Sequence, residues 1–143
     1  MRFWDASAVV PLIAEEPLSR TSQALLGEDS GMVVWWGTLV ECWSALARRH
    51  REGKLDVAGE EAARAHLRTL QASWSEIHPN EDVRAHTGRL LRMHPLRAQD
   101  ALQLAAALVW TGSPPAGEIV VLDRRLQEAA RLEGLKPLPG DAT

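Results

Sequence analysis

Short apolar runs alternate with longer amphipathic segments along the whole chain. Met32–Trp36 (MVVWW) is the clearest run, and its continuous apolar, β-rich sequence is typical of a strand covered on both faces. Four further runs predict short strands, at residues 1–4, 75–78, 118–122 and 135–138. Because helical patterns separate the strands, we expect parallel pairing through right-handed crossovers. The predicted fold is a three-layer α/β/α sandwich with a short, mainly parallel central sheet.

The segments between the strands carry apolar residues at helical spacing. Ala98–Trp110 is apolar nearly all round, which predicts the central buried helix. Another helix is predicted from Thr38 to about Arg51, with a buried stripe of Leu39, Val40, Trp43, Leu46 and Ala47. The remaining helices are predicted after Ser7, from Pro17 to Gly27, from Val57 to about Trp74, after Asn80, and from Asp123 to Gly134.

Size and composition predict a single domain over residues 1–143. A chain of 143 residues with 45% apolar content is long enough to bury a sizeable core. Its single cysteine, Cys42, cannot form an intramolecular disulfide or a thiolate cage for zinc, so we expect a cytoplasmic protein. No apolar run approaches the roughly 18 residues that a membrane helix needs, which argues against a membrane protein.

Charge and aromatic content exclude two classes of nucleic-acid-binding protein. The formal net charge of −3 argues against a simple coat protein, which would carry a strong basic excess. The chain has six Trp, one Phe and no Tyr, so it lacks the interleaved Phe and Tyr of an RNA-recognition sheet. An enzyme that binds nucleic acid through a local patch stays compatible with this composition.

Four acidic residues are predicted to meet at one edge of the sheet. Asp5 directly follows the first strand and Asp123 follows the strand at 118–122, while Glu41 lies in the first helical turn after Met32–Trp36. Since ligands bind at the carboxyl ends of parallel strands, these three belong to the functional edge. Asp100 starts the apolar helix and joins them if that helix has its N-terminus at the same edge.

Each acid also has a purely structural interpretation. Thr38 and Glu41 fit a capping box, Asp123 fits an N-cap, and Asp100 sits where a helix dipole favours an anion. Asp5 fits the start of a turn. Together, however, four converging carboxylates would repel one another, and a hard divalent cation such as Mg²⁺ or Mn²⁺ removes that cost. Such a cation at an all-carboxylate site is suited to phosphodiester hydrolysis.

The motifs around these acids resemble those of the PIN-domain ribonucleases, and most of all the VapC toxins of prokaryotic toxin–antitoxin pairs. The four acids are spaced 36, 59 and 23 residues apart, which suits that family. The likeness runs nearly from end to end, on the following segments: Asp5-Ala-Ser7-Ala, Thr38-x-x-Glu41, Leu96-Arg97-Ala-x-Asp100-Ala-Leu-x-Leu-Ala and Val-Val-Leu-Asp123-Arg-Arg-Leu.

The resemblance implies a Mg²⁺- or Mn²⁺-dependent RNA endonuclease that forms homodimers and is inhibited by a cognate antitoxin whose C-terminal segment covers the active site. The acidic quartet is then Asp5, Glu41, Asp100 and Asp123, with Ser7 as a hydroxyl that supports the first acid. Arg97 flanks the quartet, where an arginine can bind phosphate or orient the carboxylates. Arg124 is placed similarly.

Two positions depart from the family pattern. Val121 stands where the family often has Thr or Ser, and Gln103 stands where many members carry His. The missing hydroxyl at Val121 motivates an alternative function, a catalytically inactive PIN-like module that only binds a protein partner. A phosphoacceptor domain fits poorly, because the chain has Asp5-Ala-Ser7 where a phosphatase of that kind needs Asp-x-Asp. Of the five histidines, His94 lies nearest the acidic edge.

Overall fold

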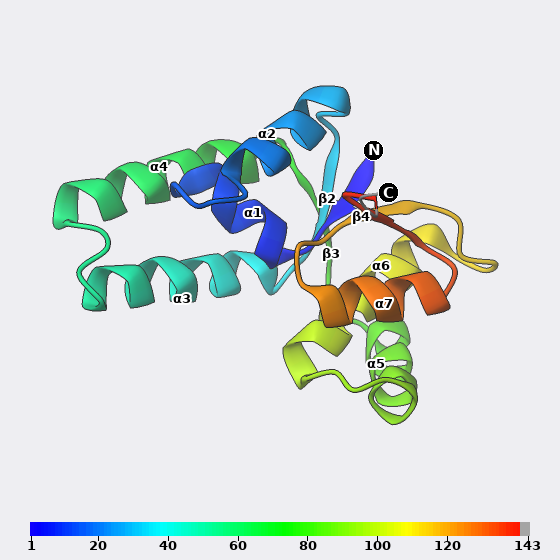
Figure 1. Cartoon of the computed structure of the whole chain (residues 1–143). Coiled ribbons are helices and arrows are strands. Elements are labelled where there is room, and N and C mark those ends of the chain that lie inside the picture. The colour runs from blue at the N-terminus through cyan, green and yellow to red at the C-terminus, as the bar shows by residue number, and fades with distance from the viewer. Residues whose placement is uncertain (141–143) are drawn as a thin grey trace.

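The computed structural model describes residues 1–140, and it resolves them into alternating strands and helices (Figure 1). The strands are β1 (Arg2–Trp4), β2 (Met32–Trp35), β3 (Ser75–Ile77), β4 (Glu118–Val120) and β5 (Lys136–Leu138). The helices are α1 (Ala6–Ile13), α2 (Ser19–Glu28), α3 (Thr38–Arg51), α4 (Val57–Ser73), α5 (Glu81–Met93), α6 (Ala98–Thr111) and α7 (Arg124–Leu132). None of these helices is long and apolar enough to cross a membrane.

The five strands form one parallel sheet in the order β3-β2-β1-β4-β5. Phe3 of β1 is in register with Val33 of β2 on one side and with Ile119 of β4 on the other. Helices α1 to α4 cover one face of this sheet and α5 to α7 cover the other (Figure 1). The predicted three-layer α/β/α sandwich is confirmed.

Successive residues of each strand enter different cores, because their side chains alternate between the two faces. Phe3 and Val33 pack with α5, α6 and α7, while Trp4 and Val34 pack with α1 to α4. Helix α6 supplies the largest share of the first core, through an uninterrupted run of buried residues from Gln103 to Leu108. The predicted central buried helix is therefore confirmed.

The predicted buried stripe of α3 is confirmed for Leu46 and, in part, for Leu39, which packs against the same core, but it is wrong for Val40 and Trp43. The fully buried residues of this helix are Thr38, Cys42 and Leu46, which recur every four positions. Cys42 and Leu46 belong to the core shared with α1 and α4. Val40 is 51% exposed and Trp43 is 42% exposed. Thr38 and Cys42 are small and weakly apolar, so a pattern of large hydrophobic residues does not mark this buried face.

Two boundaries also differ from the prediction. Helix α2 begins at Ser19, two residues after Pro17, because the Ser19 hydroxyl accepts a hydrogen bond from the Glu16 amide and organises a turn there. Strand β4 ends at Val120, although the Val121 amide still donates to the Leu138 carbonyl at 3.0 Å. The chain therefore leaves the sheet just before Asp123.

Candidate active site

The acids that follow strands lie on three neighbouring strands of the sheet. Asp5 follows β1 in the middle, Glu41 lies in the first turn of the helix after β2, and Asp123 begins the helix after β4. Asp100 lies in the first turn of α6, which packs against β2 and β3. The parallel pairing therefore places three acids at one edge, and the docking of α6 brings the fourth toward it.

Asp5 is buried, with only 4% of its surface exposed. Its Oδ2 caps α1 by accepting a hydrogen bond from the Ser7 amide at 3.0 Å. Burial raises the pKa of Asp5 to about 6; hydrogen bonds from Ser7 oppose this shift, and the charges of Asp100 and Asp123 add to it. Asp5 is thus a buried acid that is sensitive to two other members of the quartet.

Ser7 ties the two central loops of this edge together. Its Oγ accepts a hydrogen bond from the Leu122 amide at 3.0 Å, while its own amide donates to Asp5. The segment just before Asp123 is therefore held against the turn that carries Asp5. Ser7 thereby fixes the relative position of two of the four acids.

Glu41 contacts a side chain from another helix rather than capping its own. Its Oε2 accepts a hydrogen bond from Gln103 Nε2 at 2.5 Å. Burial raises the pKa of Glu41 to about 7; the charge of Asp5 adds to this effect, the hydrogen bond from Gln103 opposes it, and the charge of Asp100 adds again. The capping-box interpretation was wrong, because α3 has Gly37 as its N-cap and Thr38 already belongs to the helix.

Asp100 and Asp123 complete the quartet in different ways. Burial and the charge of Asp123 raise the pKa of Asp100, whereas the charge and the backbone amide of Arg97 lower it. Asp123 uses Oδ1 to cap α7, accepting from the Leu126 amide at 2.9 Å, as its N-cap interpretation predicted. Arg97 is the N-cap of α6 and supplies a positive charge beside the acids, without a side-chain capping bond.

Electrostatic coupling links all four carboxylates, and their chemistry fits a hard divalent cation. Asp5 interacts with the other three members, and Asp100 interacts with both Glu41 and Asp123. Across residues 1–140, no three His, Cys, Asp or Glu side chains are already arranged as a metal cage. Mg²⁺ needs no such cage, because it commonly binds through one or two carboxylates and keeps several waters. The donor set of oxygens alone suits it.

The sequence did not reveal that Thr38 takes part in this network. Thr38 is fully buried and its Oγ1 accepts a hydrogen bond from Gln103 Nε2 at 2.8 Å. From the sequence, Gln103 was predicted only to be a departure from the family pattern. A polar residue in the otherwise apolar segment Ala101–Leu108 was the available sequence signal.

Two other candidates do not join the acids. His94 Nε2 lies 2.7 Å from Glu133 Oε2, so this histidine connects the end of α5 to the end of α7. Cys42 is buried, and burial together with the charges of Glu41 and Asp5 raises the pKa of its thiol to about 12. At neutral pH this thiol stays protonated, which excludes it as a thiolate nucleophile.

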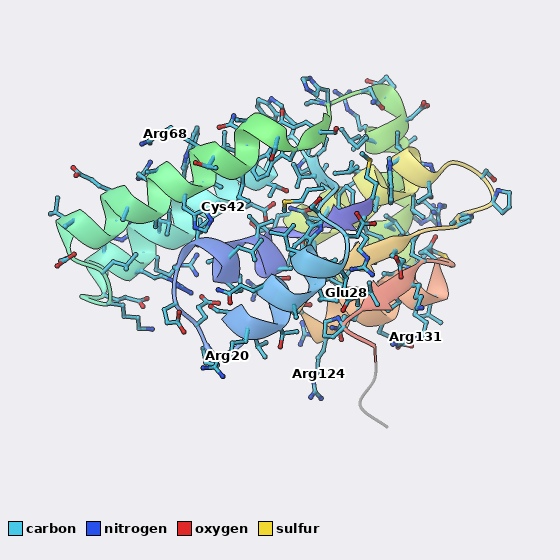
Figure 2. All side chains as sticks on the ribbon, turned by 90° about the horizontal axis from the view of Figure 1, so that it is seen from above. Arg20, Glu28, Cys42, Arg68, Arg124 and Arg131 are labelled. Carbon is cyan, nitrogen blue, oxygen red and sulfur yellow. The ribbon has the colours of Figure 1, made fainter. Side chains whose placement is uncertain are left out.

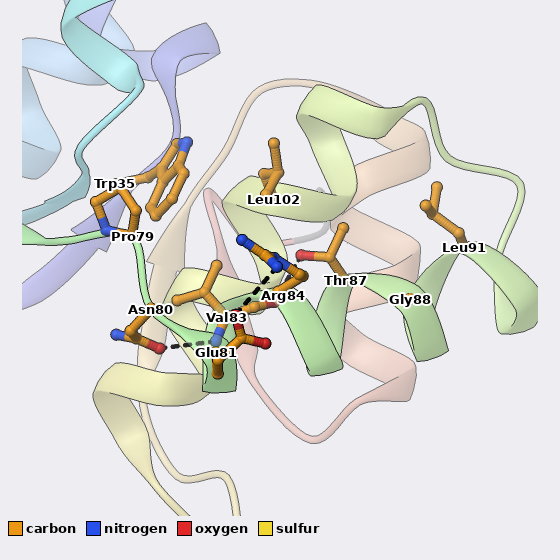
Figure 3. A pocket seen from close by; sticks show the side chains of 10 residues that line it. All are labelled: Trp35, Pro79, Asn80, Glu81, Val83, Arg84, Thr87, Gly88, Leu91 and Leu102. Atoms are coloured by element: carbon orange, nitrogen blue, oxygen red, sulfur yellow. Dashed lines mark hydrogen bonds and ion pairs between the residues drawn. The ribbon is translucent and has the colours of Figure 1, made fainter.

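Two hollows on the surface are lined by neighbours of the acids rather than by the acids themselves. One pocket of about 670 Å³ lies between Trp35, α5 and Leu102 of α6, and its wall is mainly apolar (Figure 3). A groove of about 770 Å³ begins at Leu122 and Arg124, next to Asp123. Arg124 projects from the same side of the molecule as Arg20 (Figure 2).

Comparison with known proteins assigns the family. The sequence model of the PIN domain matches residues 2–132, which is most of the chain. The chain belongs to the PIN-domain family. The resemblance expected from its motifs is thus confirmed.

Two curated PIN-domain relatives, both from Mycobacterium tuberculosis, support the assignment. Ribonuclease VapC45 of strain CDC 1551 and ribonuclease VapC49 of strain H37Rv are each 35% identical to this chain over 144 residues. The alignments cover 96% of this chain and 94% of each relative. This PIN-domain chain therefore corresponds to VapC proteins over almost their entire length.

Solved structures show the same PIN fold. VapC20 of M. tuberculosis, described as a sarcin-ricin loop cleaving toxin, superposes with a TM-score of 0.68 at 19% identity, covering 90% of this chain and 95% of that one. A toxin–antitoxin complex from Klebsiella pneumoniae gives a TM-score of 0.65 at 16% identity, covering 100% of this chain and 97% of that one. At such low identity these likenesses show the fold alone.

Proposed function

We propose that this protein is a Mg²⁺- or Mn²⁺-dependent endoribonuclease that hydrolyses RNA phosphodiester bonds as the toxin of a toxin–antitoxin pair. The observation that carries the proposal is the placement of Asp5, Glu41 and Asp123 after three neighbouring parallel strands, with Asp100 at the start of the helix packed beside them. The raised pKa values of Asp5, Glu41 and Asp100 are consistent with this proximity. The naming of two relatives as VapC ribonucleases supports the choice of RNA over other phosphodiesters.

One or two carboxylates of the quartet would hold the cation, with waters as its other ligands, and the remaining acids would add negative charge around it. The bound cation would supply neutralisation of phosphate charge and activation of water for hydrolysis. The caps of α1 and α7 fix Asp5 and Asp123 on rigid helix ends. Ser7 keeps these two ends in register through the Leu122 amide. Arg97 beside Asp100 provides a positive charge for a phosphate group of the RNA strand.

An antitoxin and a second copy of the chain are the proposed protein partners. The structural likeness to a toxin–antitoxin complex supports an antitoxin partner. That the antitoxin covers the acidic edge is what the resemblance to VapC toxins implies. Val40 and Trp43 are exposed on α3, and Trp36 is exposed in the turn just before it; these apolar side chains support a homodimer through this part of the surface. The free, buried Cys42 fits a reducing cytoplasm.

Cleavage of RNA by purified protein tests the activity. Wild type should cleave with Mg²⁺ or Mn²⁺ and stop when the ions are chelated, while Asp5→Asn should be inactive. Asp82→Asn, an identical change at an exposed site in the first turn of α5, is the matched control and should keep full activity. Equal cleavage by wild type and Asp5→Asn would refute the proposal, and binding of a partner without any Mn²⁺ uptake would favour the inactive module.

Light scattering tests the homodimer. Wild type is expected at twice its 15.8 kDa chain mass, and Trp43→Glu should shift it to the monomer, because the charge would be buried at the interface. Glu61→Gln on an exposed part of α4 is the control and should stay dimeric. A wild-type monomer at micromolar concentration would contradict this part of the proposal.

A further inference from the structure

A buried amide connects α6 to the acidic edge. Gln103 is 0% exposed, in a helix whose other buried residues are Ala and Leu. Its Nε2 donates to Thr38 Oγ1 at 2.8 Å and to Glu41 Oε2 at 2.5 Å. Its Oε1 is buried and has no hydrogen-bond partner among the described residues. A buried unpaired carbonyl costs about 1–3 kcal/mol, so packing alone does not explain a glutamine here.

The contacts give the amide one orientation. Both donors of a glutamine side chain are on Nε2, and here each is directed at a different oxygen. Turning the amide over would bring its carbonyl against the Glu41 carboxylate, where two acceptors repel. Thr38 lies one helical turn before Glu41 on α3. The amide of Gln103 therefore binds both the start of α3 and the Glu41 carboxylate.

The hydrogen bond from Gln103 restrains the Glu41 side chain, which would otherwise be mobile. A glutamate has three rotatable side-chain bonds, and ordering it costs free energy that must be offset by a contact. Gln103 contacts Glu41 through Oε2 of the carboxylate. The carboxylate is therefore held on one oxygen while it faces the charges of Asp5 and Asp100.

We propose that Gln103 is a positioning residue, which holds the Glu41 carboxylate toward Asp5 and Asp100 so that a divalent cation meets a preformed ligand. This inference rests on the metal-dependent function proposed above. Hydrogen bonds from the protein to ligating carboxylates typically contribute about tenfold to a hundredfold in metal affinity or activity. Gln103 thus acts through Glu41 and need not touch substrate.

Calorimetric titration with Mn²⁺ alone tests the inference without RNA. Gln103→Met fills the same space without a donor and should weaken Mn²⁺ binding by about tenfold to a hundredfold. Gln103→His retains a ring N–H donor and should restore most of the affinity. Leu108→Ala, which disturbs the packing of the same helix one turn further on, is the control for simple destabilisation and should bind as wild type does. Wild-type affinity in Gln103→Met would overturn the inference.

Nuclear magnetic resonance of the metal-free protein separates this inference from the proposed function. The two Nε2 protons of Gln103 should exchange slowly with water and shift in Glu41→Ala, because one of them donates to that carboxylate. Rapid exchange and no shift would overturn the inference even in an active nuclease. If wild type binds no Mn²⁺, the metal-dependent function is refuted, and so is the inference that Glu41 is a preformed metal ligand. Protected Gln103 protons in that case would show that the hydrogen bond to Glu41 has another role.

Discussion

Two clusters of charged side chains in this molecule differ in the sign of their neighbouring charges. The acidic edge gathers four carboxylates, and burial raises the pKa of Asp5 to about 6 and that of Glu41 to about 7. At the C-terminal ends of α5 and α7, Glu133 faces opposite charge instead, since it binds Arg89 at 2.9 Å and His94 at 2.7 Å. Burial opposes ionisation of Glu133, but these hydrogen bonds lower its pKa.

The acidic edge lowers the stability of the folded protein, whereas the contacts of Glu133 raise it. Like charges at the acidic edge destabilise the folded protein until a cation or a proton neutralises them. The cluster around Glu133 needs no ligand, because its charges are already paired. Substitutions at the acidic edge should therefore lower activity without lowering stability. Substitutions at the cluster around Glu133 should lower stability without lowering activity.

The largest expected effect is the loss of activity on substitution of Asp100. Asp100→Asn should lower RNA cleavage by about a thousandfold, the upper range for loss of one electrostatic partner of a transition state. The same change should leave the unfolding temperature unchanged or raise it, because it removes a carboxylate that interacts unfavourably with Asp123. Cleavage rates and thermal unfolding of one preparation measure both effects. Loss of activity together with lowered stability would contradict the comparison.

A smaller effect is expected in how the stability of the metal-free protein depends on pH. The ordinary pKa values of Asp and Glu are 3.8 and 4.5, and those of Asp5 and Glu41 are raised to about 6 and about 7. At pH values between the ordinary and the raised pKa of each group, the folded protein retains a proton that the unfolded chain has released. The stability contributed by these groups is therefore lost as pH rises from about 4 to about 7, by on the order of 3 kcal/mol for each group.

Chemical denaturation at several pH values measures this loss. The double variant Asp5→Asn, Glu41→Gln should remove most of the pH dependence, and Mn²⁺ should do so in wild type by stabilising the ionised carboxylates. A wild-type stability that rises steadily from pH 5 to pH 8 without metal would show that the acids do not interact as described.

The sequence predicted the acidic edge because strand ends and helix starts are local features. Asp5 and Asp123 directly follow apolar strands, and parallel pairing then determines which edge they share. The contact of Gln103 with Glu41 was not predicted, because it joins residues 62 positions apart on two helices whose docking leaves no periodic trace. The pairing of His94 with Glu133 escaped for the same reason.

The outward face of α3 shows a second limit of sequence reasoning. Hydrophobic periodicity identifies an apolar stripe, but it does not tell a face that enters the core from one that meets a partner. The stripe containing Val40 and Trp43 was assigned to the core, whereas Cys42 and the threonine at the start of the helix lie there instead. Small or weakly apolar residues such as these two contribute little to a hydrophobic periodicity.

The smallest expected effect is on stability at the paired cluster. Glu133→Gln should lower the free energy of unfolding by about 2 kcal/mol near neutral pH and leave RNA cleavage unchanged, since Glu133 accepts two hydrogen bonds from basic groups. Because its pKa is lowered in the folded protein, the contribution of Glu133 is present above its ordinary pKa of 4.5 and is lost at lower pH.

The partners of Glu133 sharpen this last prediction. The Arg89 side chain is 45% exposed and that of His94 only 6%, so solvent screens the first contact far more than the second. Arg89→Met should therefore cost less than about 1 kcal/mol, and His94→Leu should cost more. Denaturant titrations of the three variants at pH 7 and at pH 4 give both comparisons. If Arg89→Met were as destabilising as Glu133→Gln, the exposed ion pair rather than the buried histidine would carry the stability of this cluster.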